Sequence, residues 1–195
     1  MPFTQAVTLR GALVTLEPLA SSHHDDLVAA ASDGQLWKLW YTSVPTPVTM
    51  AAYITTALLQ QEQGLALPFA IRDNQSGRLV GTSRYCNIDS ANRRLEIGYT
   101  WYAASAQRTG INTESKKLLL SHAFEQLACI AVELRTHWIN QQSRAAIARL
   151  GAKQDGILRN HQLGVDGQYR DTVVFSITNL EWATVKRHLE FKLDR

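Results

Sequence analysis

The segment Gln-Arg-Thr-Gly-Ile-Asn-Thr-Glu, residues 107–114, has the composition of a turn that could bind a pyrophosphate. Gly110 permits positive φ and lets a backbone approach a ligand closely. The N–H groups of residues 109–113 lie at the start of a predicted helix, where they lack helical partners, and the helix dipole and Arg108 favour an anion. A plain structural turn before a helix has the same pattern, so the segment alone does not establish a site. No G-K-[ST] follows, which excludes a Walker-type nucleotide loop.

Glu96 is the only acid in the strand predicted at 93–102, and it is a candidate proton acceptor. Strict alternation along this strand predicts one face with four apolar or aromatic residues (Leu95, Ile97, Tyr99, Trp101) and a second face with the others (Glu96, Gly98, Thr100, Tyr102). Gly98 leaves room beside the carboxylate. A carboxylate in a partly buried cleft has a raised pKa and can take a proton directly or through water. The alternative is a solvated carboxylate paired with Arg84 or Arg94.

The elements that must position these groups come in a mixed order. The patterns predict strands at 13–19, 68–73, 78–85, 93–102 and 130–138, followed by two strands joined by a turn at Asp166-Gly167. They predict helices at 22–32, 49–63, 113–127, 141–150 and 179–191. Regular βαβ alternation is absent. We therefore expect an α/β (α+β) fold with a largely antiparallel, seven-stranded sheet and helices on both faces.

The composition fits one compact domain spanning 1–195. Of the 195 residues, 45% are hydrophobic and 19% are charged, and no internal repeat or linker divides the chain. The net charge of +3 comes from basic residues spread along the sequence, so no direct nucleic-acid binding is expected. No apolar stretch is long enough to span a membrane, and no pattern predicts a signal peptide. Two cysteines, Cys86 and Cys129, favour a reducing compartment, and we expect a cytoplasmic protein.

The order strand, turn, helix, strand, helix over residues 95–151 resembles the acetyl-CoA core of the GNAT acetyltransferase superfamily, and the whole chain resembles its RimJ/RimL-like branch. The family's phosphate motif reads Q/R-x-x-G-x-G/A, and the sequence matches it at five positions (Gln107, Arg108, Thr109, Gly110, Ile111). The sixth position is Asn112, a departure that backbone-mediated binding tolerates because Asn is also a good N-cap. The resemblance implies a GNAT-like fold with acetyl-CoA as co-substrate, and it extends the expected phosphate site to Thr113. It implies no metal.

The resemblance also implies further cofactor contacts. The end of the fourth strand, Thr100, Trp101 and Tyr102, should hold the pantetheine arm through main-chain hydrogen bonds. Asn140 and Ser143 match positions beside the thioester. Asn140 could instead only cap the helix that begins at Gln141.

The proton chemistry that the resemblance implies is incomplete in this sequence. Glu96 matches an acid that many relatives carry, which favours it as the base, and His137 is the second candidate. Many relatives have a tyrosine seven residues after the asparagine to protonate the leaving thiolate, but here that residue is Ile147. The hydroxyl of Ser143 could supply the proton, or the thiolate could leave without assistance.

The acceptor side is predicted from an aromatic loop. Trp37, Trp40 and Tyr41 lie in a region that walls the acceptor site in relatives, and two tryptophans suit an apolar or cationic acceptor. A core position for one tryptophan is the alternative. Asp171 could orient an amine or form an ion pair at a strand edge.

The leading interpretation is an acetyltransferase in which a primary amine, from a protein N-terminus or a small molecule, attacks the thioester directly. The alternative is an acyl-CoA-binding regulatory module with weak or no catalysis, which the residue Ile147 suggests. A basic nucleic-acid or ribosome-associated protein is suggested only by the pI of about 9.0. The sequence leaves the oligomeric state open, a homodimer included.

Overall fold

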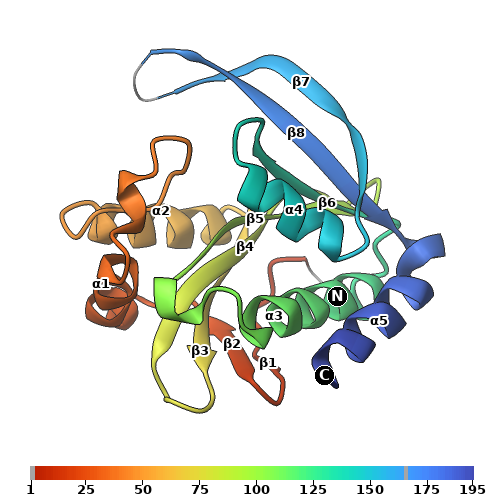
Figure 1. Ribbon diagram of the computed structural model, residues 1–195, viewed down its shortest axis with the longest axis horizontal. Coiled ribbons are helices and arrows are strands. Elements are labelled where there is room, and N and C mark those ends of the chain that lie inside the picture. Colours follow the sequence, from red (N-terminus) through yellow and green to blue (C-terminus); the bar gives the residue numbers. More distant parts are fainter. Residues whose placement is uncertain (1–2, 165–166) are drawn as a thin grey trace.

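The computed structural model describes residues 3–164 and 167–195, in which one mixed sheet runs through the molecule (Figure 1). Its eight strands are β1 (Leu9–Arg10), β2 (Val14–Pro18), β3 (Leu67–Asp73), β4 (Leu79–Asp89), β5 (Arg94–Tyr102), β6 (Ala131–His137), β7 (Lys153–Leu163) and β8 (Tyr169–Thr178). The strand order is β1-β2-β3-β4-β5-β6-β8-β7. Every neighbouring pair is antiparallel except β5 and β6. The expected mixed, largely antiparallel sheet is confirmed.

The sheet has one strand more than the sequence predicts. Leu9 and Arg10 pair with Leu16 and Thr15 to form β1. Two residues are too short to produce the alternation from which a strand is recognised.

Five helices flank the sheet: α1 (His24–Ser32), α2 (Met50–Glu62), α3 (Gly110–Ser121), α4 (Gln141–Arg149) and α5 (Asn179–Leu193). Two adjacent residues of β4 show that α2 and α3 cover opposite faces. Arg84 Nη1 donates to Gln60 Oε1 of α2 at 2.7 Å, whereas the Tyr85 hydroxyl donates to the Leu119 carbonyl of α3 at 2.6 Å. Successive side chains of a strand point to opposite faces, so the predicted helices on both faces are confirmed. No helix in the described ranges is long and apolar enough to cross a bilayer.

Helix α3 is attached to the first two strands by one buried carboxylate. Glu114 accepts hydrogen bonds from three successive backbone N–H groups, those of Ala12 at 3.0 Å, Leu13 at 2.6 Å and Val14 at 2.8 Å. A carboxylate with this many donors is well compensated for the loss of water. The contact fixes the start of α3 relative to the sheet.

Strand β5 contains a β-bulge near its end. Opposite it, Thr82 pairs with Trp101 and Arg84 with Gly98, so that Ser83 alone faces both Tyr99 and Thr100. Tyr99 has a φ of 51°, in the left-handed region. Such a bulge bends the strand and breaks the ladder, and bulges are frequent beside active sites.

Candidate active site

A cleft of about 700 Å³ opens where β5 and β6 separate. The two strands pair only through Arg94–Glu96 and Ala131–Glu133, beyond which β5 remains with β4 and β6 with β8. The start of α3, the start of α4 and the ends of β5 and β6 line the cleft. Its volume is within the range of small-molecule sites.

The predicted phosphate turn lies at this cleft, but its geometry differs from the expectation. Arg108 adopts the positive φ, 62°, whereas Gly110 does not. A Cβ on Gly110 would lie 2.6 Å from Leu13 Cδ1, so the glycine is explained by packing against the β1–β2 turn. The expectation that Gly110 supplies the left-handed conformation is therefore wrong.

Helix α3 begins at Gly110, about three residues earlier than predicted, and Thr109 is its N-cap. Thr109 Oγ1 accepts the N–H of Ile111 at 3.2 Å, which removes one of the N–H groups expected to be free. The expectation that Asn112 would be the cap is also wrong, because it is the third residue of the helix. Near the start of the helix, the N–H groups of Gly110 and Asn112 lack i−4 partners by helix geometry and can bind an anion.

The predicted cofactor residues of the turn divide into two groups. Four of them line the cleft: Gln107, Arg108, Thr109 and Asn112. Gly110 and Ile111 do not line it, and Thr113 is buried against the protein interior. The Gln107 side chain donates to the Tyr102 carbonyl at 3.0 Å and accepts from Gln142 of α4 at 3.3 Å, so it connects the turn to both neighbouring elements.

The end of β5, Thr100 to Tyr102, lines the cleft, and its contact with a pantetheine arm stays a prediction. Its side chains do not alternate strictly. The Thr100 hydroxyl contacts Ser83 at 2.8 Å and accepts from Lys116 of α3 at 2.7 Å. Thr100 thus points to the α3 face, opposite to Glu96. The expected shared face of Glu96, Gly98, Thr100 and Tyr102 is wrong, because the bulge at Tyr99 inverts the alternation.

Lys116 is a buried lysine that the sequence patterns did not single out. Its side chain is 5% exposed and lines the cleft beneath Thr100. Burial lowers the pKa of Lys116 to about 7, although Cys86 and Glu96 act in the opposite direction. A signal was present in the sequence, because Lys116 occupies the apolar face of α3 at i−3 and i−4 from Leu119 and Leu120.

Glu96 lines the cleft at the last β5–β6 pair and is 8% exposed. Asn87 Nδ2 donates to its Oε2 at 2.7 Å, and Arg135 Nε lies 3.4 Å from the same oxygen. Burial raises the pKa of Glu96, and the Asn87 hydrogen bond and the Arg135 charge partly offset this effect. A solvated carboxylate paired with Arg84 or Arg94 is therefore the wrong interpretation. Its role as base remains a prediction.

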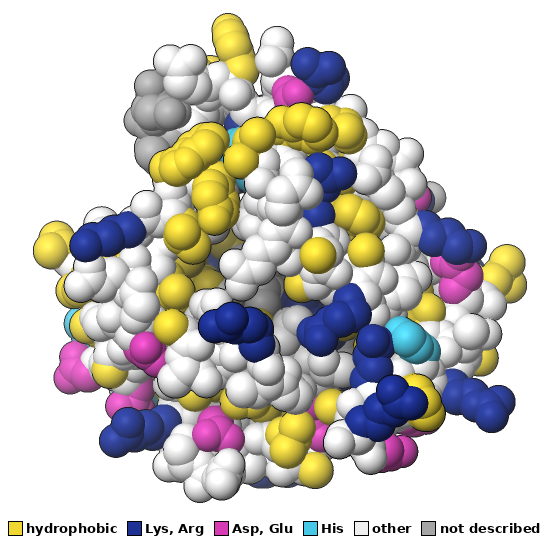
Figure 2. All heavy atoms as spheres, in the orientation of Figure 1, with side chains coloured by type: hydrophobic (Ala, Val, Ile, Leu, Met, Phe, Trp, Pro, Cys, Tyr) yellow, Lys and Arg dark blue, Asp and Glu magenta, His cyan; other side chains and the backbone are white. Residues whose placement is uncertain are grey.

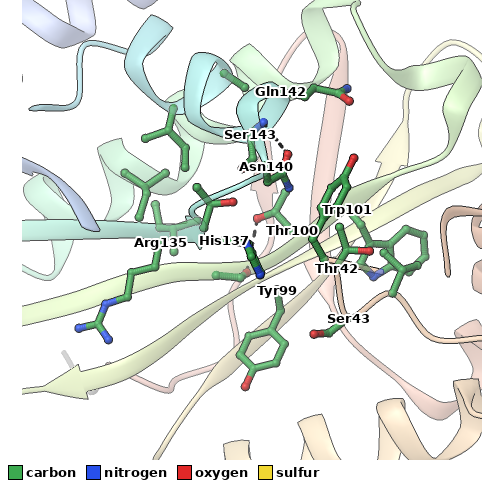
Figure 3. Close-up of a pocket in the computed structure, with 18 of the residues that line it drawn as sticks. Thr42, Ser43, Tyr99, Thr100, Trp101, Arg135, His137, Asn140, Gln142 and Ser143 are labelled. Carbon is green, nitrogen blue, oxygen red and sulfur yellow. Dashed lines mark hydrogen bonds between the residues drawn. The ribbon is translucent and has the colours of Figure 1, made fainter. Parts of the chain in front are cut away.

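Asn140 caps α4 and lines the cleft at the same time. Its Oδ1 accepts the N–H of Ser143 at 3.0 Å, which confirms that Asn140 is the N-cap and leaves open whether it also contacts the cofactor. Figure 3 shows Asn140 and Ser143 near Thr100 on one face of β5, with the Tyr99 ring pointing away from them. Ser143 lines the cleft, and Ile147 is buried in the core beside it. A cofactor role for Asn140 and a proton-donating role for Ser143 remain predictions.

The aromatic loop contributes one of its three predicted acceptor residues to the cleft wall. Tyr41 lines the cleft, whereas Trp37 packs against the core and Trp40 is 66% exposed. Trp40 nevertheless contacts His137 edge to face, with ring centroids 5.3 Å apart, and His137 lines the cleft. The three rings of Trp40, Tyr41 and His137 therefore form one cluster at its rim.

The last hairpin lies partly outside the described residues, since the turn predicted at Asp166-Gly167 includes Asp166. Asp171 accepts the N–H of Asn160 at 2.8 Å and pairs with Arg159, and it does not line the cleft. The strand-edge ion pair is thus the correct alternative. Among the described residues, no group of three or more His, Cys, Asp or Glu side chains could hold a metal ion.

The comparisons with known proteins agree with this geometry. The family described as acetyltransferase (GNAT) domain matches residues 14–153. A crystal structure of a GCN5-related N-acetyltransferase from Brucella melitensis superposes with a TM-score of 0.86 at 29% identity, covering 97% of this chain and 86% of that one. A structure from T. thermophilus, described as a "putative acetyltransferase", gives a TM-score of 0.83 at 30% identity and covers 95% of this chain and 96% of that one.

A curated relative in Bacillus subtilis (strain 168), named "Putative ribosomal N-acetyltransferase YdaF", is 36% identical over 106 residues. The match covers 54% of this chain and spans 57% of the length of that relative. Its name supports the RimJ/RimL-like branch. With the family match across β2 to the start of β7 and the separation of β5 from β6, the chain belongs to the GNAT family of acetyltransferases.

Proposed function

We propose that the protein is an acetyl-CoA-dependent N-acetyltransferase in which a primary amine attacks the thioester directly. One observation carries this proposal: the buried acid Glu96 and the anion-binding start of α3 open into the same cleft. Such an arrangement provides a proton acceptor and a cofactor anchor within a single cleft.

The residues present fit the cofactor. Arg108 and the N–H groups at the start of α3 would hold the pyrophosphate, with the helix dipole adding favourable potential. Along β5, residues 97–102 no longer pair with β6. The backbone groups on that side, apart from the Tyr99 and Tyr102 carbonyls that accept from Thr82 and Gln107, would bind the amides of the pantetheine arm. Gln107 and Asn140 border the space between them.

Different residues of the chain serve different steps of the transfer. Acetyl-CoA supplies the activated acetyl group. Glu96 accepts the amine proton, directly or through a water molecule, and its raised pKa improves the match to that task. A backbone N–H at the β5 bulge would be the group that stabilises an oxyanion formed at the thioester carbonyl. The Ser143 hydroxyl is the available donor for the thiolate, because Ile147 has none.

The acceptor is a primary amine from a protein N-terminus or a small molecule. The name of the Bacillus relative, a ribosomal N-acetyltransferase, supports a protein amine. The Trp40–Tyr41–His137 cluster supplies an aromatic rim against which an amine-bearing chain could pack. We also place the protein in the cytoplasm, which the free thiols of Cys86 and Cys129 support.

A second candidate, a regulatory module that binds acyl-CoA without turnover, is favoured by the buried Ile147. Calorimetry with CoA and acetyl-CoA, followed by thiol release from acetyl-CoA over a panel of peptides, amino acids and polyamines, separates the two. Binding with amine-dependent thiol release is expected. Binding without release for any amine would favour the module, and no binding would eliminate both candidates.

A further inference from the structure

Arg170 is a charged side chain in the cleft that forms no ion pair or hydrogen bond with the described residues, although it lies within range of the charge of Glu96. It lies on β8 two residues before Thr172, and both residues line the cleft. β6 ends opposite Thr172, so that Arg170 projects beyond the last β6 pair. Its Nε atom is buried without a hydrogen-bond partner.

The carboxylates on the surrounding strands are already engaged. Glu133 pairs with Arg94 at 2.8 Å and with Arg135 at 2.7 Å, and Asp171 pairs with Arg159. Asp155 accepts from the Ser176 hydroxyl at 3.0 Å. A half-buried guanidinium without a partner is costly, so its retention calls for an anion that is supplied from outside.

The side chains that line the cleft carry more positive than negative charge, which also favours an anionic ligand. Glu96 is the only acid among the described lining residues, whereas four are arginines (Arg108, Arg135, Arg149, Arg170). Lys116 also lines the cleft, but burial lowers its pKa to about 7, so it is not counted as a full charge. Arg84, 2% exposed behind the Tyr53 and Tyr99 rings, adds a further charge without a carboxylate partner among the described residues. Basic side chains also lie on the face that carries α3 and α4 (Figure 2).

Arg170 and Glu96 are close enough for their charges to interact, and burial lowers the pKa of Arg170 while Glu96 acts to raise it. A ligand that reaches Glu96 with its amine can therefore reach Arg170 with a second group. That group must accept hydrogen bonds and carry negative charge, which a carboxylate does with matched bidentate geometry.

We propose that the cleft selects acceptors that carry a carboxylate a few atoms from the primary amine, with Arg170 binding the carboxylate while Glu96 receives the amine. This inference rests on the proposed function and narrows its substrate class. The carboxylate can be the α-carboxylate of a free amino acid or the side chain of an acidic first residue in a peptide.

The test uses acceptor pairs in which a carboxylate is replaced by the carboxamide of similar shape. Phenylalanine is compared with phenylalaninamide, and the peptide Asp-Ala-Ala-amide with Asn-Ala-Ala-amide. For each pair, the ratio of kcat/KM for the carboxylate to that for the carboxamide is measured in the wild type, in Arg170→Gln and in Arg170→Lys. The ratio of ratios cancels the difference in amine basicity within a pair. Arg159→Gln, an exposed arginine on the neighbouring strand β7, is the matched control.

Arg170→Gln is expected to lower the carboxylate-to-carboxamide ratio by about 10- to 100-fold for at least one pair, as the loss of a charge-assisted pair would. Arg170→Lys should recover part of it, and Arg159→Gln should keep the wild-type ratio. The pair that responds identifies the source of the carboxylate. An unchanged ratio for both pairs in Arg170→Gln would overturn the inference.

Failure of the proposed function gives a different result. If none of the four compounds releases CoA thiol, the same ratios are taken from ligand-observed NMR binding in the presence of CoA. Preferential binding of the carboxylates that is lost in Arg170→Gln would then support the inference without turnover. Equal binding within each pair, or no binding of any compound, would overturn it.

Discussion

Arg135 Nε lies 3.4 Å from Glu96 Oε2 at the point where β5 and β6 stop pairing. The same guanidinium is held by Glu133, whose Oε2 accepts from Arg135 Nη2 at 2.7 Å. Arg135 therefore pairs more closely with Glu133 than with Glu96. The pKa of Glu96 stays raised, because burial outweighs the opposing effects of Asn87 and Arg135.

Replacing Glu96 should remove the proton acceptor while leaving the cleft in place. Glu96→Gln is expected to lower kcat by about 10²- to 10⁴-fold, the usual contribution of a general base. The carboxylate acts only when deprotonated, so wild-type activity should fall as pH decreases through its raised pKa. This acidic limb of the pH–activity profile should be absent in Glu96→Gln. Turnover that is unchanged across the pH range would show that Glu96 is not the base. Calorimetry with CoA serves as the control for binding.

Replacing Glu133 or Arg135, the charged neighbours of Glu96, should shift the acidic limb of the pH–activity profile in opposite directions. Glu133→Gln removes a negative charge that raises the pKa of Glu96, so the acidic limb should shift to lower pH. Arg135→Gln removes a positive charge that lowers it, so the limb should shift to higher pH. The measurement is kcat/KM against pH for both variants. Shifts of the same sign would contradict the assigned arrangement of charges.

Asn140 can be tested for its two roles separately. Asn140→Ala removes the cap of α4 and should cost about 1 kcal/mol in the free energy of unfolding, whereas Asn140→Ser keeps a capping oxygen. If the amide also contacts the cofactor, both variants lose affinity for CoA. Urea unfolding and calorimetry report the two quantities independently. Wild-type CoA affinity in Asn140→Ser would restrict Asn140 to capping.

Lys116 should make the stability depend on pH. Its folded pKa of about 7 lies below the ordinary 10.5, so between these values the unfolded chain binds more protons and stability rises with pH. Lys116→Met should therefore be stabilised relative to the wild type by an amount that shrinks as pH rises from 7 to 10, on the order of a few kcal/mol over that range.

Urea unfolding at several pH values measures this difference. Lys117→Met is the matched control, since Lys117 forms an ion pair with Glu190 at 3.3 Å on the surface of the same helix. It is expected to keep the wild-type pH dependence. Parallel stability curves for Lys116→Met and the wild type would show that Lys116 is not buried as a neutral amine.

The sequence predicts the order of elements well, because helix caps, apolar periodicity and turn residues are local signals. The separation of β5 from β6 leaves no such local signal in the sequence. It arises because β6 continues to pair with β8 through His137 while β5 continues to pair with β4, and this pairing is decided by tertiary structure. The bulge at Tyr99 is also invisible in the sequence, so face assignments made by counting fail after Gly98.

Site residues were predictable where chemistry and position coincide in one segment, as in Gln107, Arg108 and Glu96. Arg135 and Arg170 could not be predicted in this way, because arginines are common in strands and only the folded sheet brings them beside Glu96. Asn87 donates to the Glu96 carboxylate while its own backbone has a φ of 47°. No spacing of residues in the sequence predicts this left-handed conformation.

The Glu114 contact has a consequence for the order of folding. Its three hydrogen bonds join residues that are 100 to 102 positions apart in the chain, so they form only after a large loop has closed. The edge of the sheet and the helix that would receive the phosphates must therefore assemble together. We expect the amide protons of Ala12–Val14 and those of α3 from Glu114 onward, which have intrahelical acceptors, to gain protection from exchange in a single late step, which pulse-labelling during refolding would detect.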